Sequence, residues 1–166
     1  MMPEVMAYTA PGQINSYVTD ADIGKAQQGF LYGFLLMITN HGLEATLDDV
    51  PDFARYVRAL ADLRARTAHC TTEAEFADAD GLVCEGGQAK RFVRADGRSA
   101  VVLINPSDAP AWAQVQVDGA RAGAGLVHRL DGTTSSGGRL LNGQATLALR
   151  LDPRNVVVWE IDQVVP

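Results

Sequence analysis

Two aspartates, Asp20 and Asp22, form the nearest local pair of carboxylates in the first part of the chain. A pair of positioned carboxyl groups can act as general acid and general base. These two, however, directly precede a stretch with helical apolar spacing, Ile23 to Phe34. An acidic side chain at such a place caps the free amides of the first turn and faces the positive end of the helix dipole. We therefore expect the pair to start a helix rather than to catalyse a reaction.

The histidines and cysteines lack the spacing of a metal site. His69 and His128 have no ligand partners nearby in the sequence, so we interpret both as structural and expect no metal. Cys70 and Cys84 flank an acidic stretch without a second pair of ligands. Two free thiols are the favoured interpretation, and a disulfide is the alternative because spacing alone does not fix geometry.

Other catalytic and cofactor motifs are missing from the sequence. There is no G-x-S-x-G elbow, and Ser135-Ser136 lies in a glycine-rich turn. The run Gly123-Ala124-Gly125 lacks the third glycine and the following helix of a dinucleotide-binding loop. We therefore expect no cofactor.

Composition limits the class of protein. The chain has 166 residues, 47% of them hydrophobic, which is enough for a core. Its longest apolar run, Phe30 to Ile38, is interrupted by Gly33 and too short to span a membrane. A net charge of -6 repels a phosphate backbone, so nucleic acid is not an expected partner, and the short apolar run gives no reason to expect a membrane. The start Met1-Met2-Pro3-Glu4 lacks the features of a secretory signal, which makes the cytoplasm the default location; secretion stays open if sequence precedes Met1.

The first eighty residues alternate between strand and helix patterns. A short apolar run predicts a buried strand at Val5 to Tyr8, and the turn formers from Ala10 to Ser16 predict a loop. Helical spacing follows at Ile23 to Phe34, then a buried strand at Leu35 to Thr39. The clearest helix, Pro51 to Thr67, starts at a proline, which suits the first turn.

The pattern changes near residues 81–87, which we interpret as a linker between two domains. From Gln88 onward short extended runs recur between turn signals, which is typical of a sandwich. The predicted strands are Lys90 to Arg94, Ser99 to Asn105, Ala113 to Asp118, Gly125 to Leu130, Gln144 to Leu151 and Val156 to Ile161. The predicted fold is thus an α/β segment over residues 1–80 followed by an all-β antiparallel sandwich over residues 88–166.

This order of elements resembles the closing part of TIM-barrel glycoside hydrolases. The resemblance rests on the segments Tyr56 to Arg64, Ser99 to Pro106 and Leu151 to Glu160, which are similar to the last barrel helix and to two strands of the terminal domain in those enzymes. It implies that Val5 to Tyr8 is barrel strand seven and Leu35 to Thr39 strand eight. The largest clan of retaining enzymes carries its nucleophile glutamate at the end of strand seven, but Tyr8 and Thr9 occupy that place here.

The resemblance also implies where a site would lie. Active sites of these barrels lie at the carboxyl ends of the strands, which makes Tyr8, Asn40 and His41, together with Asp22, the candidate substrate-binding residues. For each, an ordinary loop or capping role is the plainer alternative. Glycoside hydrolysis needs two opposed carboxyl groups. We expect that pair on barrel strands that this chain does not contain, so the catalytic residues stay unknown.

Two functions follow as expectations. The first is the C-terminal portion of a glycoside hydrolase that is not catalytic alone; its residues 1–70 would bind the remainder of a barrel or self-associate. The second is a non-catalytic sandwich that binds carbohydrate or is structural. Trp159 alternates with Val157 and Ile161 and is expected in the core, whereas Trp112 follows Pro110 at a strand entry and suits core or surface equally. An exposed Trp112 would favour sugar binding.

Overall fold

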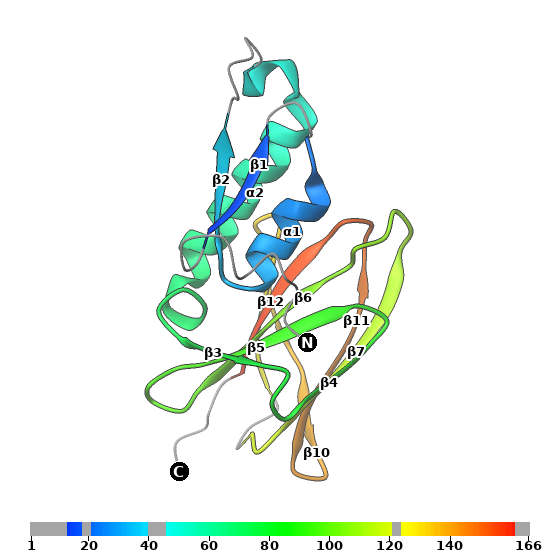
Figure 1. The fold of residues 1–166 in the computed structure, drawn as a ribbon. Coiled ribbons are helices and arrows are strands. Elements are labelled where there is room, and N and C mark those ends of the chain that lie inside the picture. Colours follow the sequence, from blue (N-terminus) through cyan, green and yellow to red (C-terminus); the bar gives the residue numbers. More distant parts are fainter. Residues whose placement is uncertain (1–12, 18–20, 40–45, 121–123, 162–166) are drawn as a thin grey trace.

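The computed structural model describes residues 13–17, 21–39, 46–120 and 124–161. It begins with a parallel β-α-β unit (Figure 1), in which strand β1 (Gln13–Tyr17) and strand β2 (Leu35–Thr39) pair in register from Gln13 opposite Leu35. Helix α1 (Ile23–Leu31) connects them. The strand predicted at Val5 to Tyr8 lies outside the described residues. The predicted loop over Ala10 to Ser16 is wrong in its second half, because pairing with β2 outweighs the turn propensity of Asn15 and Ser16.

Two further helical segments follow. Helix α2 spans Pro51–Thr67, as the sequence predicts, after the 3-10 turn η3 (Leu47–Asp49) and before the 3-10 turn η4 (Ala68–Cys70). Helix α1 is three residues shorter than predicted. It ends where Gly33 takes a left-handed φ of 73°, which releases Phe34 from the helix and lets β2 begin. No helix in these ranges has the length and apolar character needed to cross a bilayer.

The rest of the chain forms an antiparallel sandwich, as predicted. One sheet has six strands in the order β3-β5-β6-β12-β8-β9, and the other has four in the order β10-β11-β7-β4. The six-stranded sheet comprises β3 (Glu75–Asp78), β5 (Gln88–Val93), β6 (Ser99–Ile104), β12 (Val156–Ile161), β8 (Gly125–Arg129) and β9 (Thr134–Gly137). The four-stranded sheet comprises β10 (Arg139–Leu141), β11 (Gln144–Leu151), β7 (Ala111–Asp118) and β4 (Leu82–Glu85).

The predicted linker is a strand of this sandwich. Residues 81–87 contain β4, which pairs with β7, and β3 already joins the six-stranded sheet before residue 80. Within this segment Gly86 allows close packing of the two strands. A Cβ built on Gly86 would lie 1.8 Å from the backbone oxygen of Trp112, so only glycine permits this approach.

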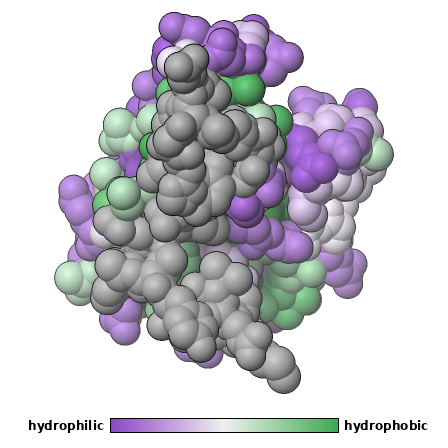
Figure 2. Space-filling view, turned by 45° about the horizontal axis from the view of Figure 1, so that its top comes forward, coloured by the Kyte–Doolittle hydropathy of each residue, from purple (hydrophilic) through white to green (hydrophobic). Residues whose placement is uncertain are grey.

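Two cores share the six-stranded sheet. Side chains of one parity on β6 and β12, such as Val101 and Trp159, face the four-stranded sheet, which confirms Trp159 as a core residue. Side chains of the other parity, such as Val102 and Val158, pack against α1 and α2. The protein is therefore three layers deep, with the helical unit on the outer face of the larger sheet (Figure 1). Figure 2 shows mostly hydrophilic side chains on the visible described surface, interrupted by smaller apolar patches.

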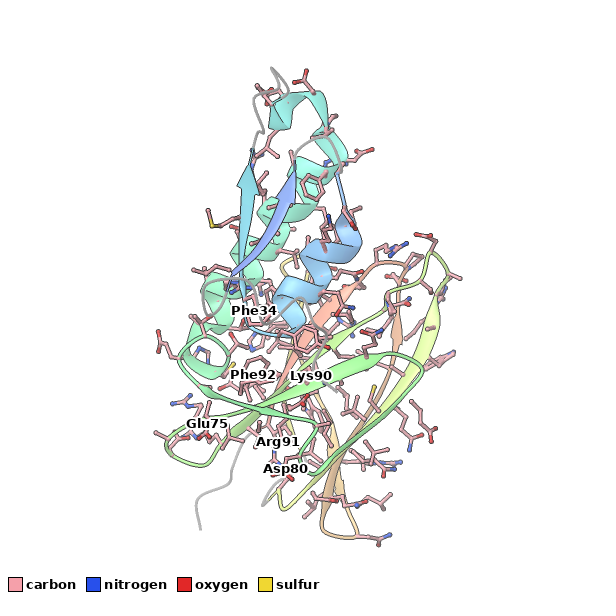
Figure 3. All side chains as sticks on the ribbon, viewed as in Figure 1. Phe34, Glu75, Asp80, Lys90, Arg91 and Phe92 are labelled. Carbon is pink, nitrogen blue, oxygen red and sulfur yellow. The ribbon has the colours of Figure 1, made fainter. Side chains whose placement is uncertain are left out.

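An aromatic cluster and one buried amide join the helical unit to the sandwich. Phe76 and Phe92 form an edge-to-face pair with centroids 5.4 Å apart, and the Tyr32 ring lies 6.1 Å from Phe76. Figure 3 places Phe34 and Phe92 at this junction, with Lys90 beside them. Elsewhere in the same interface, Gln27 of α1 is fully buried. Its side-chain amide donates to the backbone oxygens of Asn105 (3.0 Å) and Asn155 (3.3 Å). The first segment is thus anchored on the sandwich.

Candidate functional site

Of the four predicted substrate-binding residues, the structure places one. Asp22 is the N-cap of α1, and its Oδ1 accepts a hydrogen bond from the backbone amide of Lys25 at 3.0 Å. The helix-start role inferred from the sequence is confirmed for Asp22, whereas Asp20 lies outside the described residues. Tyr8, Asn40 and His41 lie outside the described residues, so their role, like a substrate contact by Asp22, stays a prediction.

Strand β2 has one packed face and one bare face. Leu36 and Ile38 pack against the core formed with α1 and α2. Leu35 and Met37, which point the other way, are 52% and 41% exposed. Parallel sheets are normally covered on both faces, so two adjacent large apolar side chains in solvent are unusual for a parallel strand.

A second candidate surface is the outer face of the four-stranded sheet. Trp112 on β7 is 74% exposed there and lies opposite Arg150 on β11. Gln114 and Gln116 follow it on the same face of the strand, and Glu85 of β4 is opposite Gln114. An exposed aromatic ring with amide, carboxylate and guanidinium groups close by supplies both a stacking surface and hydrogen-bonding groups.

A cavity of about 400 Å³ adjoins this face at the open side of the sandwich. Gln114 lies on the outer face of the sheet and also lines this cavity. The polar residues of its wall are Gln114, Arg129, Ser135, Ser136, Arg139 and Thr146. The sequence placed Ser135-Ser136 in a turn, but both lie on edge strand β9, where pairing with β8 holds them in extended backbone at the cavity wall.

A buried polar cluster lies where η4 meets the six-stranded sheet. Glu160 on β12 is 7% exposed, and its two carboxylate oxygens face two imidazoles. His69 Nε2 lies 3.0 Å from Oε1, and His128 Nε2 lies 3.5 Å from Oε2. The sequence did not indicate this proximity, because the fold brings together side chains that are far apart in the chain, and the structural role expected of both histidines stays a prediction.

The surroundings of Glu160 hold this cluster in place. His128 Nδ1 lies 3.2 Å from the Thr134 hydroxyl oxygen, which orients the ring. Arg94 approaches Glu160 Oε1 at 3.8 Å while it pairs with Asp96 at 3.1 Å. One signal for the cluster was present in the sequence. Glu160 lies two and four positions after Val158 and Val156, so in a strand it points to the same face as these two buried residues. It is a charged residue on a face that is otherwise apolar and buried.

Both cysteines are free thiols, as the favoured interpretation held. Cys70 is fully buried, and its Sγ donates to the Thr67 backbone oxygen at 3.3 Å. Burial, aided by the negative charge of Glu160, raises the pKa of the Cys70 thiol to about 12. Cys84, only partly buried on β4, also has a raised pKa because of burial. Neither thiol is poised as a nucleophile at neutral pH.

Known structures with a similar fold are glycoside hydrolases. An α-amylase from Anoxybacillus matches with a TM-score of 0.54 and 15% identity, over 96% of this chain and 40% of the amylase. CelM2, a bifunctional glucanase-xylanase from a metagenome library, matches with a TM-score of 0.50 and 17% identity, over 93% of this chain and 31% of that protein. No protein-family model matches the chain, and no curated protein matches it in sequence. The chain thus spans less than half the length of these structures, and the resemblance inferred from the sequence is confirmed at the level of the fold.

Proposed function

We propose that this chain is the C-terminal portion of a carbohydrate-active glycoside hydrolase, in which the β-α-β unit and α2 complete a β/α barrel and the sandwich buttresses it. One observation carries the proposal. Strand β2 of a parallel pair is covered by helices on one face and presents Leu35 and Met37 to solvent on the other. In a barrel, helices cover the outside of the strands and the opposite side chains fill the interior, so a missing barrel would leave this face bare.

The chain alone is expected to lack catalytic activity. Hydrolysis of a glycoside needs two carboxyl groups on opposite sides of the scissile bond. Asp22, the candidate substrate-binding carboxylate, is engaged with the first turn of α1, as its expected capping role requires. Incubation of the purified chain with aryl glycosides should release no aryl alcohol above background. Turnover that Asp22→Asn abolishes would refute this part of the proposal.

The exposed face of β2 also supports a proposal for the partner, which is the remainder of the barrel or a second copy of the chain. When the remainder of the barrel is absent, two copies of the chain should cover their apolar strands by contacting each other. Sedimentation velocity over a range of concentrations should show association. The double variant Leu35→Ser/Met37→Ser should remain monomeric, since it removes apolar surface without touching either core.

A matched control variant separates this face from general surface apolarity. Leu140 and Leu141 on edge strand β10 are 48% and 47% exposed, which is similar to the exposure of the β2 pair. Leu140→Ser/Leu141→Ser should associate like the unmodified chain. Equal loss of association in both double variants, or a monomeric unmodified chain, would count against the barrel interpretation.

The exposed Trp112 favours a second candidate function, a carbohydrate-binding role of the sandwich. The chain has two tryptophans, and the other, Trp159, is 1% exposed, so a ligand on the outer sheet face would change the emission of Trp112 alone. Titration with neutral oligosaccharides such as xylo- and malto-oligosaccharides should shift the fluorescence of the chain. Trp112→Phe, which keeps a smaller stacking ring, should bind more weakly, and Trp112→Ala should not bind. An unchanged spectrum at millimolar oligosaccharide would leave this face a structural one.

A further inference from the structure

The cluster around Glu160 has no part in the proposed function, yet it brings together three kinds of metal ligand. His69, Cys70 and Glu160 each offer one ligand atom, and these three atoms lie within 4.8 Å of one another. Two of the residues are adjacent in η4, and the third comes from the far end of the chain on β12. The turn of η4 after α2 therefore sets two ligands against the outer face of the sheet.

The chemistry of these donors selects the ion. An imidazole nitrogen, a thiol sulfur and one carboxylate suit Zn²⁺, whereas Mg²⁺ and Ca²⁺ prefer sites made entirely of oxygen. In a tetrahedral zinc site with ordinary bond lengths, neighbouring ligand atoms lie about 3.3 to 3.6 Å apart. His69 Nε2 and Glu160 Oε1 are 3.0 Å apart and the three ligand atoms lie within 4.8 Å of one another, so the ion would need the exposed imidazole to move outward and the three side chains to close around it by about 1 Å.

A second observation points to a ligand at this place. His128 Nε2 is buried, has no hydrogen-bond partner and faces the second oxygen of Glu160 at 3.5 Å. A buried imidazole nitrogen without a partner is costly, and a carboxylate that ligates a metal is itself hydrogen-bonded by neighbouring groups, which is the place that His128 would take beside Glu160. The His69 side chain, by contrast, is 44% exposed. The site thus has a buried rear wall and an opening through which an ion can enter.

We propose that the chain binds one Zn²⁺ ion through His69 Nε2, Cys70 Sγ and the Glu160 carboxylate, with water as the fourth ligand at the open side and His128 positioning the carboxylate. Binding breaks the S–H bond of Cys70 and forms a Zn–S bond, and the proton leaves to solvent, with no change of oxidation state. The guanidinium of Arg94, which lies 3.8 Å from Glu160 Oε1, stays with Asp96 when the ion takes its place. The ion would clamp the end of α2 to β12.

Two features of the cluster act against the ion and limit its affinity. Burial raises the pKa of Cys70, so the metal must displace a proton that the thiol holds strongly. Arg94 supplies a positive charge that already compensates Glu160. The Zn–S and Zn–N bonds must outweigh both effects for the ion to bind.

The test uses the full chain stripped of metal with a chelator and then titrated with Zn²⁺ in a calorimeter and with Co²⁺ in a spectrophotometer. We expect one ion per chain and a sulfur-to-cobalt charge-transfer band in the near ultraviolet, which reports thiolate ligation independently of stability. Cys70→Ser should abolish the band, and Cys84→Ser, which removes the other free thiol, should leave band and affinity unchanged. His69→Ala should weaken Zn²⁺ binding at least tenfold, and His128→Asn, which does not remove a ligand, by about 10-fold to 100-fold.

Several results would overturn the proposal. These are the absence of Zn²⁺ binding by the unmodified chain, a cobalt spectrum without thiolate ligation, or a spectrum lost in Cys84→Ser but kept in Cys70→Ser. Circular dichroism of each variant checks that the fold is intact. If Cys70→Ser fails to fold, His69→Ala decides, because this half-exposed side chain can be truncated without opening the core. Association through Leu35 and Met37 is measured separately, so the barrel proposal and the metal proposal fail independently.

Discussion

Phe92→Ala should uncouple the helical unit from the sandwich. Phe92 is 2% exposed at the centre of the aromatic junction, where its ring packs edge-to-face on Phe76 and lies against Gly33. Truncation of a fully buried phenylalanine removes its transfer free energy and leaves a cavity, which together cost about 3 to 5 kcal/mol. The lost aromatic pair contributes about 0.5 to 1.5 kcal/mol of that total. Because the ring belongs to the core shared with α1 and α2, we expect the helical unit to lose its packing first.

Urea unfolding followed by circular dichroism measures the effect. The variant should lose about 3 to 5 kcal/mol of unfolding free energy. Helical signal should disappear at lower urea than the strand signal. Trp112→Ala is the matched control, since it removes an aromatic ring that is 74% exposed, and its unfolding free energy should change by no more than about 0.5 kcal/mol. A Phe92→Ala variant with a loss below about 1 kcal/mol would show that the helical unit is not held by this junction.

Four further predictions concern buried or closely packed groups. Without added metal, a thiol reagent at pH 8 should label Cys84 of the folded chain and leave Cys70 unlabelled until urea unfolds the protein, because Cys70 is fully buried and its raised pKa keeps it protonated. The same raised pKa makes the free energy of unfolding depend on pH. The contribution of the protonated Cys70 thiol is complete below the ordinary thiol pKa of about 8.5 and declines as pH rises toward about 12. Thermal unfolding across that pH range measures the decline. Gln27→Leu should cost about 1 to 3 kcal/mol in urea unfolding, since the buried Asn105 carbonyl loses the donor that Gln27 supplies and the Asn155 carbonyl keeps only the Asn105 amide; an unchanged midpoint would contradict those bonds. Gly86→Ala should prevent folding, because the added Cβ would lie 1.8 Å from the backbone oxygen of Trp112. Gly132 also has a positive φ, but an added Cβ there meets no atom within 4 Å, so Gly132→Ala should fold with reduced stability. Circular dichroism of the two variants measures the difference.

The sequence is informative where one local pattern decides the structure. Helix α2 begins and ends as predicted, because its amphipathic stripe and Pro51 act within the helix itself. Strands β11 and β12 also match their predicted bounds, since alternation and apolar runs between turn residues reflect burial directly. The strands that the sequence failed to indicate, β1 and β4 among them, are short segments with polar or glycine-rich surroundings. Their strand character comes from the partner to which they pair.

The candidate sites depend on contacts between distant parts of the chain. Glu160 lies next to His69 only because η4 packs on β12, a proximity of side chains that 91 positions separate in the sequence. Trp112 could be read as core or surface from its neighbours, and only the pairing of β7 with β4 and β11 decides that it faces solvent. Local spacing thus indicates which residues carry reactive side chains, but it does not show which of these side chains contact one another in the fold.

The measurement that tests the central claim most directly is the size of the native polypeptide that carries these residues. An antibody raised against the sandwich should be used on an immunoblot of the source cells and of their medium. If the chain is the terminal portion of a glycoside hydrolase, the antibody should detect a polypeptide at least twice the 17.7 kDa of this chain, in keeping with the 40% of the amylase that it covers. A single stable polypeptide of 17.7 kDa would contradict the account.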